Sequence, residues 1–233
     1  MTVFRWDCGA AYRVVFSTRV GGVSEGPFAS LNLGRLTLDR EENVEENRRR
    51  LCAEVGADVA TLALNRQRHS ATVNRARAGA RGEPGDGLWS DEPGVPMLKL
   101  TADCIPIALA REDRAALAVL HAGWRGLLEG IVDAGATALG GTLRAAVGPA
   151  IGPCCYEVGP EVAEPFRRRF GADVVTGRKL DLWTAAERAL REAGVGTVER
   201  FDLCTSCNPE QFFSHRRDAG VTGRQGVIGV VAG

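Results

Sequence analysis

The chain has 233 residues, of which 45% are hydrophobic and 25% charged, a composition typical of a soluble globular protein with a sizeable core. Its 29 basic residues balance its 29 acidic residues, which argues against a general electrostatic footprint for nucleic acid. No apolar run is long enough to cross a bilayer, and the first twenty residues lack the apolar core of a signal peptide. We therefore expect a cytoplasmic protein without nucleic-acid or membrane partners.

Short strand-like runs alternate with amphipathic helical segments along the chain. Strands are expected at 12–18, from 62 onward, and at 105–110, 115–120, 143–147, 198–203 and 226–231; helices are expected at 39–55, 126–139, 160–170 and 181–193. Residues 76–87 are rich in Arg and Gly and are predicted to form an exposed loop. Because no repeat, low-complexity tract or linker interrupts the pattern, we predict one α+β domain with mixed sheets over residues 1–233.

Residues 99–125 combine two buried apolar runs with two potential metal ligands. A charged turn at 111–114 separates the runs, and this favours a β-hairpin over a helix. Cys104 precedes the first run and His121 follows the second, so a hairpin would bring them together although they are 17 positions apart. His69, 35 positions before Cys104, is a third candidate ligand.

Two imidazoles and one thiolate form a donor set that suits Zn²⁺. Three protein ligands leave one position for water or substrate, which is typical of a catalytic zinc site. A single Cys in an apolar strand, however, is more often a small core residue, and a single His is more often solvated or hydrogen-bonded. Although the chain has only three His, the spacing alone leaves both interpretations open.

Several blocks of the sequence are similar to the signature blocks of the YfiH-like, or laccase-domain, family. They are STRVGGVSEGPFASLNLG (17–34), ENRRRL (46–51), TADCIPIAL (101–109), HAGWRGL (121–127), GPAIGPCCYEVG (148–159) and CTSCNPEQFFSHRRDAGVTGRQGVI (204–228). The resemblance runs from about Phe16 to Val231. Members of the family are called polyphenol oxidases, peptidoglycan editing factors or purine nucleoside phosphorylases.

The resemblance implies a layered α/β/β/α arrangement with mixed sheets, shared with the catalytic domain of cytotoxic necrotising factor. It also implies that His69, Cys104 and His121 are zinc ligands. One departure is notable, because Arg68 and Ser70 flank His69 where the family usually has Val and Gly. We expect metal binding to persist and the rim of the pocket to differ.

The activity implied by the resemblance is phosphorolysis of purine nucleosides. The expected substrates are phosphate with adenosine, inosine, guanosine or methylthioadenosine, and deamination of adenosine is an implied side activity of the same zinc. Guanidinium groups bind phosphate through paired donors, so Arg19, Arg48 and Arg125 are candidate phosphate ligands. Asn32 and Asn47 are candidate partners of the ribose or base.

Two further residues are assigned beside the expected zinc. Asp103 adjoins Cys104 and is predicted to orient a ligand or carry a proton, since carboxylates near zinc ligands tune such sites. His215 is predicted to form part of the wall of the site and not to be a ligand. Small-molecule substrates and a monomer or small homo-oligomer are expected.

The remaining cysteines are interpreted as structural. Seven Cys, an odd number, are better read as thiols than as a disulfide framework. Cys204 and Cys207 have C-x-x-C spacing, but a four-cysteine zinc site needs a second pair, and Cys154 and Cys155 are adjacent. We predict packing and loop-shaping roles for these four thiols.

Three alternative functions stay open. A His₂Cys set also suits copper, as in a phenol oxidoreductase, although three His cannot supply a multinuclear copper cluster as well. Cys104 with a His base would suit a hydrolase or deamidase. A non-enzymatic metal-binding partner protein is the third alternative.

Overall fold

The apolar runs form short strands, and amphipathic helices lie between them. The computed structural model describes residues 1–233. The strands are β1 (Val3–Trp6), β2 (Tyr12–Ser17), β3 (Leu64–Arg66), β4 (Val73–Arg75), β5 (Arg81–Pro84), β6 (Gly87–Ser90), β7 (Met97–Thr101), β8 (Ile105–Arg111), β9 (Leu117–Ala122), β10 (Leu143–Val147), β11 (Val175–Thr176), β12 (Lys179–Leu180), β13 (Thr197–Arg200) and β14 (Gln225–Val231). The helices are α1 (Glu41–Glu54), α2 (Trp124–Glu129), α3 (Ile131–Leu139), α4 (Pro160–Phe170) and α5 (Leu182–Glu192). None of them is both long and apolar enough to pass through a lipid bilayer.

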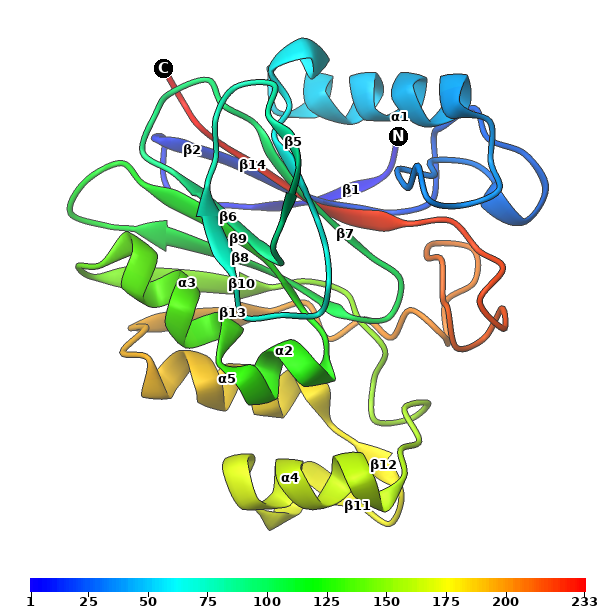
Figure 1. Ribbon diagram of the computed structural model, residues 1–233, viewed down its shortest axis with the longest axis vertical. Coiled ribbons are helices and arrows are strands. Elements are labelled where there is room, and N and C mark those ends of the chain that lie inside the picture. Colours follow the sequence, from blue (N-terminus) through cyan, green and yellow to red (C-terminus); the bar gives the residue numbers. More distant parts are fainter.

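Two sheets stack in the middle of the molecule (Figure 1). The four-stranded sheet has the order β1–β2–β14–β7, and all its neighbouring strands are antiparallel. The six-stranded sheet has the order β13–β10–β8–β9–β6–β4. Its outer pairs, β13 with β10 and β6 with β4, are parallel, whereas its inner pairs are antiparallel. The second sheet is therefore mixed.

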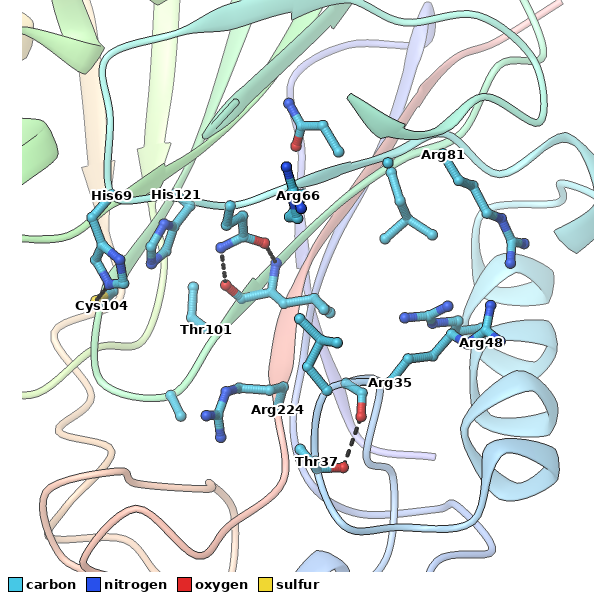
Figure 2. A pocket seen from close by; sticks show the side chains of 18 of the residues that line it. Arg35, Thr37, Arg48, Arg66, His69, Arg81, Thr101, Cys104, His121 and Arg224 are labelled. Carbon is cyan, nitrogen blue, oxygen red and sulfur yellow. Dashed lines mark hydrogen bonds between the residues drawn. The ribbon is translucent and has the colours of Figure 1, made fainter. Parts of the chain in front are cut away.

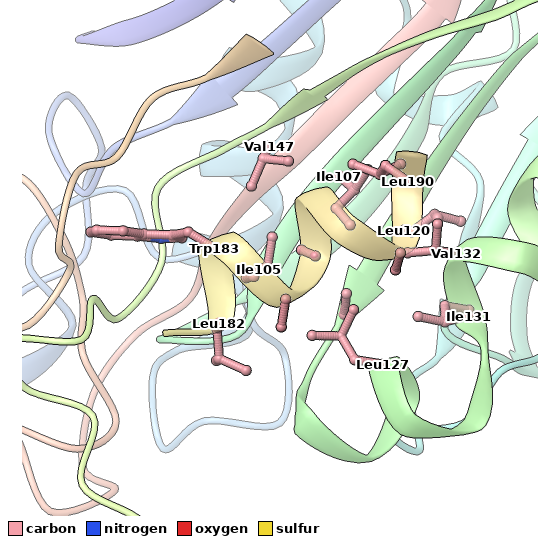
Figure 3. Close-up of a cluster of buried hydrophobic side chains, with 14 of the residues drawn as sticks. Ile105, Ile107, Leu120, Leu127, Ile131, Val132, Val147, Leu182, Trp183 and Leu190 are labelled. Atoms are coloured by element: carbon pink, nitrogen blue, oxygen red, sulfur yellow. The ribbon is translucent and has the colours of Figure 1, made fainter. Parts of the chain in front are cut away.

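Three groups of buried side chains hold the layers together. Phe16 and Val227 of the four-stranded sheet pack against Ala108 and Val119 of the six-stranded sheet. Helix α1 covers the outer face of the first sheet, and helices α2, α3 and α5 cover the outer face of the second (Figures 1 and 3). The layer order is thus α/β/β/α, as predicted.

Most predicted elements are confirmed, and two differ from the structure. The β8–β9 hairpin forms, and it pairs Pro106 with His121. The single helix predicted over 126–139 is instead two helices, because Gly130 adopts a left-handed conformation (φ 88°) that ends α2 before α3 begins. The segment 76–87, predicted as an exposed loop, contains the exposed strand β5 but ends in buried residues, among them Asp86.

Candidate metal centre and adjoining cavity

Three side chains from separate segments converge at one end of the β8–β9 hairpin. Cys104 immediately precedes β8, His121 is the next-to-last residue of β9, and His69 follows β3. The potential ligand atoms of the three residues all lie within 4.8 Å of one another. The Nε2 atom of His69 is 3.9 Å from the Sγ atom of Cys104. This geometry matches the donor set of a divalent metal site, with two nitrogens and one sulfur.

One buried carboxylate, that of Asp86, holds both histidines. His121 Nδ1 lies 2.7 Å from Asp86 Oδ1, so the ring donates there and leaves Nε2 free to bind a metal. The backbone N–H groups of Arg68, His69 and Ser70 also donate to the Asp86 carboxylate. Although burial alone would raise the pKa of Asp86, these hydrogen bonds outweigh it, and the pKa lies well below its ordinary value.

The protonation states of the other groups suit a bound cation. Burial, partly opposed by Asp86, lowers the pKa of His121, so its imidazole is neutral near pH 7, the form that binds a metal. Burial and then the charge of Asp103 raise the pKa of the Cys104 thiol to about 12. A divalent cation would supply the positive charge that a thiolate requires there.

The backbone around the cluster is tightly constrained. His69 (φ 60°) and Asp103 (φ 87°) both adopt left-handed backbone conformations that residues other than glycine rarely adopt. Such conformations cost free energy and are enriched at functional sites. A methyl group at Gly123 would lie 2.9 Å from His69 Cδ2 and 3.1 Å from Cys104 Sγ. Glycine at position 123 therefore permits the close approach of two of the three candidate ligands.

The cluster forms one end of a cavity of about 610 Å³ (Figure 2). Five arginines line the cavity, and no Asp or Glu does: Arg35, Arg48, Arg66, Arg81 and Arg224. Figure 2 shows Arg35, Arg48 and Arg81 at the end opposite His69 and Cys104, with Arg66 and Arg224 between the two ends. The lining thus favours an anionic ligand group.

The arginines differ in how far their charges are compensated. Arg35, Arg48 and Arg81 share one carboxylate, that of Glu45. Burial, together with Arg81 and Arg35, lowers the pKa of Arg48 to about 10 despite Glu45, so Arg48 stays charged at pH 7. Arg224 donates to the carbonyl oxygens of residues 222 and 223, and has no carboxylate partner among its hydrogen bonds.

Five of the residues predicted from the sequence line this cavity, namely Arg48, His69, Cys104, His121 and His215. Asp103 and Arg125 do not line it. The Asp103 carboxylate accepts hydrogen bonds from Thr205 Oγ1 and from the backbone N–H of Arg216, each at 2.6 Å. The Arg125 guanidinium lies over the Trp124 ring, 4.3 Å from its centroid. The carboxylate that orients a candidate ligand is Asp86.

Arg19, Asn32 and Asn47 lie outside the cavity lining and bind backbone groups. Arg19 Nε donates to the carbonyl of Ala29, and Asn47 Nδ2 donates to the carbonyl of Asn32. Asn32 Oδ1 accepts from the backbone N–H of Arg224 at 2.9 Å. These side chains therefore shape the loop over residues 17–34 and hold Arg224, while direct contact with a substrate stays a prediction.

Sequence reasoning missed Asp86 and four of the cavity arginines. Arg224 lies within the family block at 204–228, so the family resemblance could have pointed to it. Asp86 lies in a Gly-rich segment without any motif, and only its burial and hydrogen bonds reveal it.

Comparison with known proteins identifies the family. The sequence model of the family described as "Multi-copper polyphenol oxidoreductase laccase" matches residues 13–231. The chain belongs to this laccase-domain family.

Relatives of this laccase-domain chain carry a common name. The chain is 38% identical to "Purine nucleoside phosphorylase PA4543" of Pseudomonas aeruginosa, over 94% of this chain and 93% of that protein. It is 35% identical to "Purine nucleoside phosphorylase YfiH" of Escherichia coli, over 96% of each chain. The crystal structure of YfiH from Bacillus licheniformis is similar with a TM-score of 0.93 and 29% identity, covering 99% of this chain and 96% of that one. The predicted resemblance and fold are confirmed.

Proposed function

We propose that this laccase-domain protein is a zinc-dependent purine nucleoside phosphorylase. It would convert adenosine, inosine, guanosine or methylthioadenosine and phosphate into the free base and the pentose 1-phosphate. The observation that carries the proposal is the three-ligand cluster at one end of a cavity lined by five arginines and no carboxylate. The cavity is of the size that binds small molecules, and its charge suits phosphate.

Different residues of the chain have different roles in the proposed reaction. His69, Cys104 and His121 would hold the zinc, which when bound supplies Lewis-acid stabilisation of negative charge. Arg66 and Arg224 lie between the cluster and the far end of the cavity, and we assign them to phosphate because a guanidinium offers paired donors. Arg48 stays charged and adds to the same positive field. Phosphate is thereby held facing the nucleoside near the metal ligands.

Two alternatives fit the site less well. A Cys–His hydrolase needs a thiol whose pKa is lowered, whereas burial raises the pKa of Cys104 to about 12. A multicopper oxidase, which the family's description names, needs more His ligands than the three in the chain. Zinc is favoured over a single copper because the cavity arginines suit an anionic substrate and not a phenol.

The test is base release from inosine by metal-analysed protein, with and without phosphate. We expect hypoxanthine only when phosphate is present, and zinc in the active preparation. Cys104→Ala should lower the rate by more than about 100-fold, since even groups that only orient a zinc ligand contribute 10–100-fold. The matched control is Cys8→Ala, which removes a buried thiol that does not line the cavity.

Three outcomes would contradict the proposal. They are base release without phosphate, near wild-type turnover by the Cys104→Ala protein, and copper content accompanied by oxidation of phenols. The side activity has its own readout, because deamination converts adenosine into inosine in the absence of phosphate.

A further inference from the structure

Four cysteines that the proposed reaction does not use meet between two loops. Cys154 and Cys155 lie in the loop after β10, and Cys204 and Cys207 lie in the loop after β13. The four Sγ atoms all lie within 4.8 Å of one another. Cys207 Sγ is 3.4 Å from Cys154 Sγ and 3.3 Å from Cys155 Sγ. The adjacent pair, which the sequence analysis considered unsuited to a four-cysteine site, thus faces the C-x-x-C pair.

Backbone pairing brings the two loops together. Ala150 and Cys204 form a parallel bridge beyond the parallel strands β10 and β13. The N–H of Ala150 donates to the carbonyl of Leu203, and the N–H of Thr205 donates to the carbonyl of Ala150. The thiols therefore occupy their places through main-chain hydrogen bonds, independently of any sulfur–sulfur bond.

We propose that Cys154, Cys155, Cys204 and Cys207 form a second, structural zinc site. Four sulfurs bound tetrahedrally at about 2.3 Å from zinc are about 3.8 Å apart, which is close to the spacing here. All four residues are free thiols, and their separations are far longer than the roughly 2.05 Å of a disulfide. With four protein ligands no coordination position stays open, so this metal would stabilise structure and take no part in chemistry.

Polar groups around the cluster suit four thiolates on one cation. The backbone N–H of Gly152 lies 3.3 Å from Cys204 Sγ and donates to it. The ammonium group of Lys179 lies 2.6 Å from the carbonyl oxygen of Cys154, which places a positive charge beside the cluster. Zinc with four thiolates carries a net charge of about −2, and hydrogen bonds and cations of this kind stabilise such a centre.

The second site would also position a ligand of the first. Ile151, three residues before Cys154, donates its N–H to the carbonyl of Asp103. Thr205, next to Cys204, donates its hydroxyl to the Asp103 carboxylate. Asp103 precedes Cys104 and is held in a left-handed conformation. A metal that fixes the two loops would therefore fix the backbone that presents Cys104.

The test measures metal content in a protein whose first site is disabled. Full-length Cys104→Ala protein should retain one equivalent of zinc by elemental analysis and native mass spectrometry. The variant Cys104→Ala/Cys154→Ser/Cys207→Ser should retain none, whereas Cys104→Ala/Cys8→Ala, which removes a thiol outside both clusters, should keep one equivalent. Added zinc should raise the thermal unfolding midpoint of the Cys104→Ala protein and leave that of the triple variant unchanged.

A second measurement on the wild-type protein does not depend on the variants folding. Before chelation, Cys154 and Cys207 should resist alkylation although both are exposed, and a chelator should release zinc and make Cys154, Cys155, Cys204 and Cys207 reactive together. Each of four results would overturn the proposal. The Cys104→Ala protein could contain no zinc, or it could contain iron in place of zinc. A disulfide-linked peptide could join the two loops, or all four thiols could be alkylated without a chelator. Failure of the phosphorylase assay would leave these measurements unaffected.

Discussion

The two thiol-bearing clusters differ in what surrounds them. The His69–Cys104–His121 cluster lies at the end of a strand pair, is oriented by a buried carboxylate, and opens into a 610 Å³ cavity. The four-cysteine cluster lies on loops, has two exposed members, and lines no part of that cavity. Three ligands facing a cavity suit reactivity, whereas four ligands away from it suit structural support. The number of ligands and the presence of an adjoining cavity, more than the type of ligand, distinguish the reactive role from the structural one.

The largest expected effect comes from the carboxylate that only the first cluster has. Asp86→Asn removes the charge that orients His121 and weakens the hydrogen bonds of three backbone N–H groups. We expect zinc affinity at the first cluster to fall by about 10–100-fold, measured by competition with a chelating dye. Asp91→Asn, which removes a carboxylate paired with Arg75 at the surface, is the control. Equal zinc affinity in the Asp86→Asn and Asp91→Asn proteins would contradict the role given to Asp86 at the first cluster.

The cavity beside the first cluster supplies the next test. Arg224→Ala removes a guanidinium that lines the cavity and has no carboxylate among its hydrogen-bond partners. Loss of a charged hydrogen-bonding partner should raise the KM for phosphate by about 10–30-fold, with a smaller change in the KM for inosine. Arg40→Ala, at an exposed position before α1, is the matched control. A larger effect on inosine than on phosphate would assign Arg224 to the nucleoside instead.

Gly123→Ala tests the close packing of the first cluster without removing a ligand. Because the backbone at Gly123 has φ −79°, alanine fits the backbone, and only its contacts with His69 and Cys104 are unfavourable. Displacement of both ligands by a few tenths of an ångström should weaken zinc binding by about 5–10-fold while the second site keeps its metal. Gly196→Ala, where the nearest atom would be 3.6 Å away, should match the wild type. Unchanged affinity would show that the cluster tolerates the shift.

The smallest expected effect concerns stability beneath the first cluster. Lys99 is fully buried, and burial lowers its pKa to about 7, opposed only by Asp86. Between pH 7 and 10.5 the unfolded chain binds more protons at this residue than the folded chain, so stability should rise with pH. From pH 7 to 8, before thiols titrate, the rise should be about 1 kcal/mol in wild type relative to Lys99→Met, measured by urea unfolding. If the free energy of unfolding depended on pH in the same way in wild type and in Lys99→Met, the lowered pKa of Lys99 would be contradicted.

Local patterns were sufficient to predict the elements that carry the site. The hairpin around Arg111–Arg114, the strand 143–147 and the helix 160–170 follow from apolar runs bounded by charges, Gly or Pro. The break between α2 and α3 was missed because the apolar positions keep helical spacing across Gly130, and only the left-handed backbone there reveals the interruption.

Long-range partners could not be predicted from one sequence. Asp86 contacts His121 across 35 positions, and the four cysteines meet across about 50. Neither contact leaves a local signal, since each depends on strand order and on how loops pair beyond the strands. Asn32 and Asn47 are a further case, because their polar character suggested substrate binding, but one sequence did not reveal that both also bind backbone groups.

The β8–β9 hairpin has a consequence for how an ion enters and leaves. Strand pairing within the six-stranded sheet sets the spacing of Cys104 and His121, so that spacing exists before any ion arrives. Binding of an ion there would therefore require no refolding of the chain, whereas its release would require the bonds to all three ligand atoms to break. The centre would then take up its ion after the polypeptide has folded, and not as a condition of its folding.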